Sequence, residues 1–129
     1  MKQLEIDVEK PPFDAALINL KGILNTVTVV ELESLVQKEF LRLDKYYFIF
    51  NLSGITSISS AGAGFFIKLL STVGEHKGVI LFTQLSEQSK EMFNLLGLSA
   101  VLNITPDTKT AKNIMERILQ GEIIKGLKS

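Results

Sequence analysis

Cysteine and tryptophan are both missing from this 129-residue sequence, and histidine occurs only once. Without cysteine the chain forms no disulfide, offers no thiolate nucleophile and builds no cysteine-rich metal site. Such a chain suits a reducing compartment, and we expect a cytoplasmic protein. Because no group of histidine and acidic residues has metal-ligand spacing either, the sequence indicates no metal and no cofactor.

An excess of charge of either sign is missing as well. Fourteen Lys and Arg residues balance fourteen Asp and Glu residues. A neutral chain has no long-range field that would attract a nucleic-acid backbone or an anionic bilayer. No apolar run approaches the roughly 18 residues that a membrane-spanning helix needs, and the sequence over 1–14 does not resemble a secretory signal. We therefore expect neither nucleic-acid binding nor membrane insertion.

Apolar residues are plentiful, at 46% of the chain, and they fall into short segments. Period-two alternation or continuous apolar runs predict strands over 4–8, 15–20, 46–52, 79–83 and 101–104. Helical spacing and capping residues predict helices over 28–42, 60–75, 86–96 and 107–118. We expect one domain over 1–120, followed by a loosely ordered tail over 121–129.

This order, β-β-α-β-α-β-α-β-α, predicts an α/β fold with a mostly parallel sheet. The short connection through Pro11 and Pro12 indicates that the first strand pairs antiparallel with the second, at a charged edge of the sheet. Right-handed crossovers that add strands in one direction place the helices largely on one face.

Two finer predictions concern helix surfaces. Thr28 and Glu31 have the spacing of a capping box at the start of the first helix. In the third helix we expect Met92, Leu95 and Leu96 to face the core.

The segment Ser-Ile-Ser-Ser-Ala-Gly-Ala-Gly over 57–64 joins a predicted strand to a predicted helix, and it resembles three known loops without matching any of them. A dinucleotide-binding loop would need a third glycine where Ile67 stands, and a P-loop would need a lysine that is missing. A nucleophile elbow centred on Ser60 would need glycine where Ile58 stands. The one histidine, His76, lies sixteen residues further on, roughly 24 Å along a helix, and so cannot act as a base for Ser60. We therefore expect no catalytic residues here.

The hydroxyl groups of this segment allow two interpretations. Ser59 or Ser60 can serve as an ordinary helix N-cap. Alternatively, Ser60 can accept a phosphate, because the start of a helix favours a negative group, and this would add about two negative charges to the surface.

A helical wheel of 60–75 places Phe66 and Leu70 toward the core. Glycine inside a helix costs roughly 1 kcal/mol relative to alanine, so Gly64 suggests that something approaches the backbone closely. We therefore predict a protein-docking surface at the helix start and on its outward side, formed by Ser59, Ser60, Ala61, Gly64, Phe65, Lys68 and Thr72.

The segment FNLSGITSISSAGAGFFIKLL resembles the central motif of STAS domains, the family of sulphate transporters and anti-sigma factor antagonists. In that motif a strand ending in Asp-Leu-Ser leads to Asp-Ser-Ser-Gly-Leu-Gly and then to a helix. The element order, the stretch GVILFTQLSEQSKEMFNLLGLSAVLNI and the final helix are also similar to the family. Two family aspartates are replaced, one by Asn51 and one by Ser59.

The resemblance implies a bacterial regulator of transcription. Stand-alone members of this size bind an anti-sigma factor that is also a serine kinase, and thereby free a sigma factor. The kinase phosphorylates the serine at the helix start, which aligns with Ser60, and a phosphatase reverses the reaction; Ser59 is the second candidate acceptor.

Two other functions remain open at this point. One is a constitutive scaffold or transporter-associated subunit that binds through the same helix without being modified, which the loss of both aspartates favours. The other is an enzyme that depends on Ser60. The sequence also leaves the oligomeric state open, a homodimer included.

Overall fold

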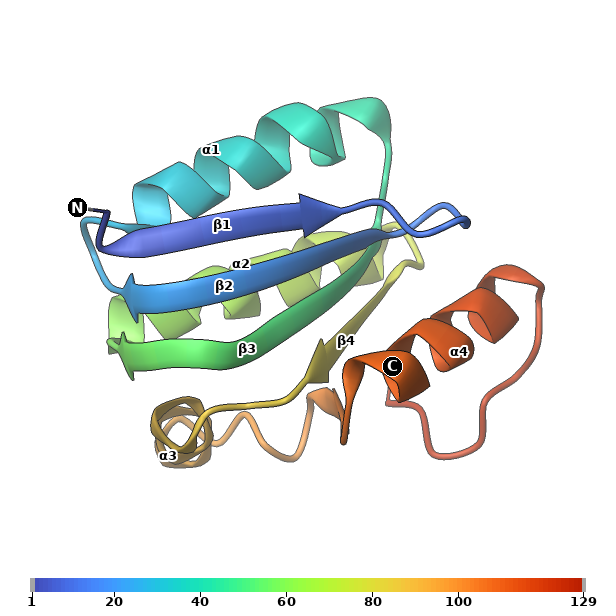
Figure 1. Cartoon of the computed structure of the whole chain (residues 1–129). Coiled ribbons are helices and arrows are strands. Elements are labelled where there is room, and N and C mark those ends of the chain that lie inside the picture. Colours follow the sequence, from blue (N-terminus) through green and yellow to red (C-terminus); the bar gives the residue numbers. More distant parts are fainter. Residues whose placement is uncertain (1, 129) are drawn as a thin grey trace.

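The computed structural model describes residues 2–128 as an α/β domain with five strands and four α-helices (Figure 1). The strands are β1 (Leu4–Glu9), β2 (Ala16–Leu24), β3 (Tyr47–Ile58), β4 (Val79–Thr83) and β5 (Asn103–Thr105). The helices are α1 (Val29–Glu39), α2 (Ser60–Glu75), α3 (Glu87–Leu95) and α4 (Thr108–Leu119), and a short 3-10 turn, Leu41–Leu43, follows α1. None of these helices is long and apolar enough to cross a membrane.

The strands form one sheet in the order β1-β2-β3-β4-β5. β1 is antiparallel to β2, and every other neighbouring pair is parallel, as the sequence predicts. β1 places Leu4, Ile6 and Val8 toward the core and exposes its acidic residues, which discourage strand addition at this edge.

β3 continues six residues beyond the predicted strand 46–52. Its pairing with β2 is irregular in two places, between Asn19 and Lys21 and between Gly22 and Ile23. At each irregularity β3 contributes one residue more than β2, so the alternation of inward and outward side chains is broken. For this reason the sequence after Leu52 lacks the regular alternation that predicts a strand. The extension carries the chain to Ser59, directly before α2.

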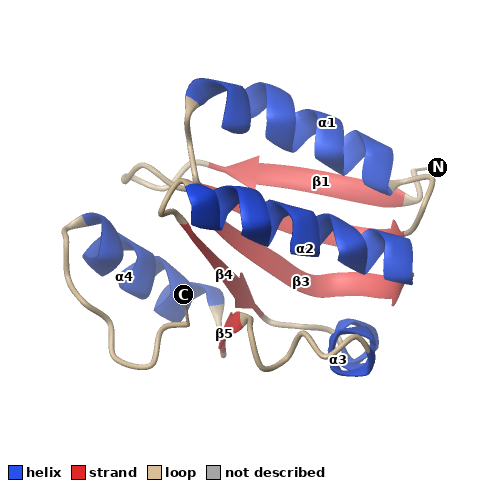
Figure 2. Cartoon of the chain, turned by 180° about the vertical axis from the view of Figure 1, so that it is seen from behind, coloured by secondary structure: helices blue, strands red, loops and turns tan. Residues whose placement is uncertain are grey.

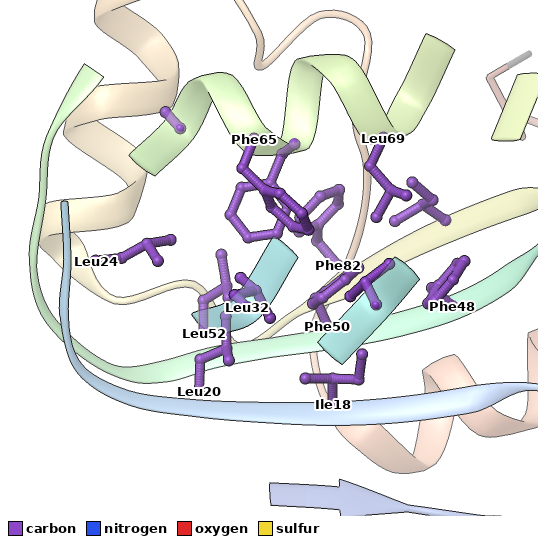
Figure 3. Packing of buried hydrophobic residues seen from close by; sticks show 14 of the residues in the cluster. Ile18, Leu20, Leu24, Leu32, Phe48, Phe50, Leu52, Phe65, Leu69 and Phe82 are labelled. Atoms are coloured by element: carbon purple, nitrogen blue, oxygen red, sulfur yellow. The ribbon is translucent and has the colours of Figure 1, made fainter. Parts of the chain in front are cut away.

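The two faces of the sheet differ. One face is covered by α1, α2 and α3, and it holds the larger core cluster, in which the ring of Phe50 lies between those of Phe48, Phe66 and Phe82 at centroid distances of 5.8, 5.1 and 5.8 Å (Figures 2 and 3). On the other face α4 buries Ala111 and Met115 against a smaller cluster on β2, β3 and β4. The helices therefore lie largely on one face, with α4 as the exception.

The predicted capping box at the start of α1 is wrong. The side chain of Thr28 caps no helical amide; its hydroxyl donates to the carbonyl oxygen of Ile23 at 2.8 Å. The Oδ1 of Asn25 accepts from the amides of Val27 and Thr28 at 3.0 Å, and both amides belong to the turn before α1. Glu31 turns away to form an ion pair with Lys2. The chain before α1 thus forms a tight turn after β2, and the two reciprocal hydrogen bonds of a capping box are not formed.

The prediction for α3 is wrong for Leu95 and Leu96, whereas Met92 packs against the larger core cluster as predicted. Phe93 is the fully buried residue, whereas Met92 is half-buried, and Leu95 and Leu96 are 79% and 38% exposed. The short helix crosses the end of the sheet, so that Phe93 inserts against Phe66 and Phe82. The spacing of apolar residues in α3 was therefore not sufficient to predict which side of the helix faces the core.

The stretch after α4 has no helix or strand up to Lys128. Leu127 packs on the smaller core cluster, and the side chain of Asn103 forms two hydrogen bonds with the main chain of Lys128.

Candidate functional site

The start of α2 is fixed by Ser59, which is the N-cap of the helix. Ser59 has extended backbone angles, with φ at −92° and ψ at 169°, and its Oγ accepts a hydrogen bond from the Gly62 amide at 3.1 Å. Its own amide donates to the carbonyl oxygen of Leu24 at 3.0 Å. Of the two serines proposed as the cap, Ser59 therefore has this role, and the end of β2 anchors the helix start.

Gly62 allows the helix to approach β2 closely. A β-carbon at this position would lie 2.5 Å from the carbonyl oxygen of Leu24, closer than real β-carbon contacts allow. The contact is with backbone, which cannot rotate away as a flexible side chain would. Any side chain at Gly62 would therefore displace the start of α2.

Ser60 is the first residue of α2, and it is exposed. Because Ser59 caps the Gly62 amide, the amides of Ser60 and Ala61 remain without an acceptor among residues 2–128. The first turn carries no acidic residue. An exposed hydroxyl thus stands at the positive end of a sixteen-residue helix, beside unpaired donors.

One of the predicted docking residues, Phe65, does not lie on the surface. It is only 6% exposed, and its ring packs edge-on against those of Phe50 and Phe66 at centroid distances of 6.4 and 5.2 Å (Figure 3). The helical wheel is misleading here because α1 lies beside α2 and covers the flank that carries Phe65 (Figure 2). The prediction that Phe65 is exposed is therefore wrong.

The other predicted docking residues are at least partly accessible. Ala61 and Lys68 are exposed, and Gly64 and Thr72 are half-buried. Lys68 and Thr72 line a shallow hollow between α1 and α2, whose wall includes Phe65. Within the described residues no atom lies within 4 Å of a β-carbon placed on Gly64, whereas the backbone of Leu24 approaches Gly62 closely. The approach of a partner to Gly64 stays a prediction.

Three exposed apolar side chains on elements that neighbour α2 were missed. Val27 and Val30, at the start of α1, are 75% and 61% exposed. Leu95 of α3 lies with Thr56 and Ile58 along a hollow beside the end of β3. Figures 1 and 2 place α3 at the same end of the molecule as the starts of α1 and α2. Val27 and Val30 do not belong to the apolar positions with helical spacing in α1. This departure from the spacing could have indicated from the sequence that the two valines are exposed.

His76 lies at the C-terminal end of α2, far from Ser60, as the sequence predicts. Its ring stacks on Tyr46 with centroids 3.9 Å apart, and its Nδ1 donates to the carbonyl oxygen of Thr72 at 2.9 Å. Loss of solvent contact, together with a hydrogen bond to Asp44 and the negative charge of that residue, raises the pKa of Tyr46. This group belongs to the far end of the helix.

Asn51, which stands where STAS domains often have aspartate, lies away from Ser60 as well. Seven residues separate it from the end of β3, roughly 20 Å of strand. Its side-chain amide donates to Asn19 at 2.9 Å, and Asn19 in turn donates to Asp7 and Glu9 on β1. Asn51 therefore belongs to a polar network across the sheet, and only Ser59 replaces a family aspartate beside Ser60.

Comparison with known proteins agrees with this architecture. The family model described as STAS domain matches residues 5–120. The structure is similar to the protein TM1081 of Thermotoga maritima, with a TM-score of 0.80 and 19% identity over 87% of this chain and 95% of that chain.

Two further solved structures are similar. An anti-sigma factor antagonist from Mycobacterium paratuberculosis has a TM-score of 0.76 at 16% identity, over 88% of this chain and 94% of that one. The anti-sigma factor antagonist SpoIIAA of Bacillus, in its unphosphorylated form, has a TM-score of 0.73 at 14% identity, over 93% of this chain and 100% of that chain. At these identities the likeness shows the fold alone.

Proposed function

This chain belongs to the STAS domain family, and we propose that it acts as an anti-sigma factor antagonist that is controlled by phosphorylation of Ser60. In this proposal the unmodified domain binds an anti-sigma factor that is also a serine kinase, in the bacterial cytoplasm. Phosphorylation by that kinase ends the complex, and a phosphatase restores it. The protein itself has no catalytic role. SpoIIAA, one of the structural relatives, is known in both unphosphorylated and phosphorylated forms.

The position of Ser60 carries this proposal. Its hydroxyl is exposed on the first residue of α2, where a kinase can reach it without unfolding the domain. Ser59 is only half-exposed, and its oxygen already accepts the Gly62 amide, so it is the weaker acceptor for a phosphate. A phosphate on Ser60 would lie next to the unpaired amides of Ser60 and Ala61 and the positive end of the helix dipole.

The surroundings of Ser60 explain how a phosphate would end a complex. Val27, Val30 and Leu95 expose apolar side chains at the same end of the molecule, and Ala61 leaves the backbone accessible. Such an apolar rim favours a protein partner, with Lys68 and Thr72 extending the surface along α2. A phosphate on Ser60 would have to lose its water when a partner docks on this end of the molecule, which opposes binding.

The test begins with capture of the kinase. The full chain, tagged and expressed in its native cell, is purified with its partners, and its intact mass is measured. Purified protein is then incubated with the captured kinase and ATP. We expect the mass of one phosphate to be added, and the S60A variant to remain unmodified.

Ser71→Ala is the matched control, because Ser71 is another exposed serine of α2, and this variant should be phosphorylated normally. Ser60→Asp should reduce partner capture, because it places a negative charge at the proposed site. A phosphate that persists in the S60A variant, or capture unaffected by S60D, would contradict the proposal.

A constitutive scaffold or transporter-associated subunit is the second candidate function. The observation that favours it is the N-cap residue Ser59, which stands directly before Ser60 in place of the family aspartate. If the chain is such a scaffold, we expect the captured protein to have the unmodified mass under all growth conditions. We also expect wild type and the S60A variant to bind the same partner.

A further inference from the structure

A second surface feature lies on the other flank of α2, away from α1. It is a hollow of about 640 Å³ between α2, the start of β4, the segment after Leu98 and the chain end near Lys128. The hollow exists because β5 is shorter than β4. β5 pairs with Leu81, Phe82 and Thr83, whereas Val79 and Ile80 pair only with β3. No strand covers this side of the first half of β4 within the described chain.

The walls of the hollow are mostly apolar. Ile67 and Val101 are 44% and 53% exposed, although both are large aliphatic residues, and the half-buried Leu70 lies between α2 and the sheet. Ile80 and Leu98 form buried parts of the lining. Two exposed aliphatic side chains of the domain, Ile67 and Val101, thus line one shared space.

The charge around this space is of one sign. Lys77 and Lys128 line the hollow, and among the described residues no acidic side chain does. This is a local departure in a chain whose charges balance overall. Lys77 forms no ion pair within residues 2–128, whereas the four ion pairs of the domain lie elsewhere.

The two lysines are held in place by the backbone. Lys77 has φ at 58°, in the left-handed region that ends α2, and the amides of Lys77 and Gly78 satisfy the carbonyls of Gly74 and Val73. The main chain of Lys128 is bound by the Asn103 side chain at 2.7 and 2.9 Å. Its Nζ donates to the carbonyl oxygens of Ser99 and Leu102, and it forms no ion pair with a carboxylate among residues 2–128.

We propose that this hollow binds a small amphiphile with an alkyl chain and a carboxylate head. Its volume lies within the range of about 300–1,000 Å³ that is usual for small-molecule sites. The alkyl chain covers Ile67, Leu70 and Val101, and the carboxylate lies near Lys77 and Lys128. This site is separate from the surface around Ser60 and does not depend on the proposed function.

Decanoate, kept below its micelle concentration, is the probe for the full-length chain. Amide NMR spectra are recorded during a titration at low ionic strength. We expect saturable shifts confined to the second half of α2, the start of β4 and residues 98–103. Raising the salt concentration should weaken binding, because the lysines are partly exposed. The uncharged analogue decanol and the cationic decyltrimethylammonium should bind more weakly than decanoate.

Two variants test the two halves of the site. Lys77→Gln should weaken decanoate binding about threefold, the effect of removing one exposed charge pair. Val101→Asp should abolish measurable binding, because it places a like charge on the apolar wall, and its exposed position should leave folding intact. Lys38→Gln is the matched control, since Lys38 is an exposed lysine of α1 outside the hollow, and it should bind like wild type.

Several results would overturn the proposal. These are the absence of saturable shifts, shifts centred on another face, or equal affinity for decanoate and decyltrimethylammonium. If the K77Q variant bound decanoate with unchanged affinity, the charge of Lys77 would not contribute to binding. The proposal that the ligand has a carboxylate head would then be wrong. Shifts caused by an acidic amphipathic peptide but not by decanoate would assign the hollow to a protein partner instead.

Discussion

The starts of α2 and α4 have the same type of N-cap hydrogen bond but differ in charge. Each is capped by a side-chain oxygen that accepts the amide three residues later, from Ser59 to Gly62 at 3.1 Å and from Asp107 to Thr110 at 2.7 Å. Asp107 is a carboxylate, and its hydrogen bonds with Thr110 lower its pKa. The first turn of α2, by contrast, carries no acidic residue at all.

This difference gives the two helix starts different electrostatics. At α4 a negative charge already compensates the positive end of the helix dipole. At α2 the cap is neutral, the backbone is pressed against Leu24, and the exposed apolar residues Val27, Val30 and Leu95 lie at the same end of the molecule. The first turn of α2 thus carries no negative group of its own, and the proposed phosphorylation of Ser60 would add one.

Gly62→Ala should break the α2 start most strongly. The added β-carbon meets the carbonyl oxygen of Leu24 at 2.5 Å, so helix and strand must separate. We expect the free energy of unfolding to fall by about 2 kcal/mol, because overpacking outweighs the higher helix propensity of alanine. Urea unfolding measures this change. An equal or higher stability would show that the close approach to β2 has no energetic consequence.

Ser59→Ala should have a smaller effect, since it removes only the cap. A lost N-cap typically costs about 1 kcal/mol. Ser59→Asp should keep the cap and gain about 0.5 kcal/mol from the helix dipole, making the α2 start resemble that of α4. Both values come from urea unfolding. If S59D were less stable than S59A, the α2 start would not tolerate a negative charge, and the proposed phosphorylation would lose its physical basis.

Gly64→Ala should stabilise the domain slightly, in contrast to Gly62→Ala. No atom lies within 4 Å of the added β-carbon, so the higher helix propensity of alanine should raise the free energy of unfolding by about 0.8 kcal/mol. Partner capture by this variant tests the docking surface separately. Reduced capture with raised stability would place the partner against Gly64, whereas unchanged capture would restrict the docking surface to the α2 start.

The order of elements could be predicted from the sequence because each strand and helix has its own local signal. β4 and the start of α2 are found where apolar runs and capping residues place them. The second half of β3 could not be predicted, because its two irregular pairings with β2 depend on contacts between distant segments. For the same reason the turn that Asn25 stabilises before α1 was missed, since its shape follows from the end of β2.

The candidate site was predicted only in part, and the errors have one cause. Periodicity gives the angle of a side chain around its own helix, but not which flank a neighbouring helix covers. Phe65 is therefore buried beside α1 although the wheel turns it outward, and Leu95 is exposed although its spacing fits a core position. Ser60 was placed correctly because its exposure depends on the helix start itself, which the sequence marks locally.

The smallest expected effect concerns α4 and its dependence on pH. Because the pKa of Asp107 is lower in the folded state than its ordinary value of 3.8, the carboxylate stabilises the fold above that value, and this contribution is lost as the pH falls through the folded pKa. Asp107→Asn keeps a capping oxygen but removes the titration. We therefore expect wild type to exceed D107N in stability at neutral pH and the gap to narrow in acid, as followed by urea unfolding. Ser59→Ala is the comparison, because the loss in free energy of unfolding that it causes should stay constant over the same pH range. If that loss instead decreased in acid as the loss in D107N does, the two helix starts would not differ in charge.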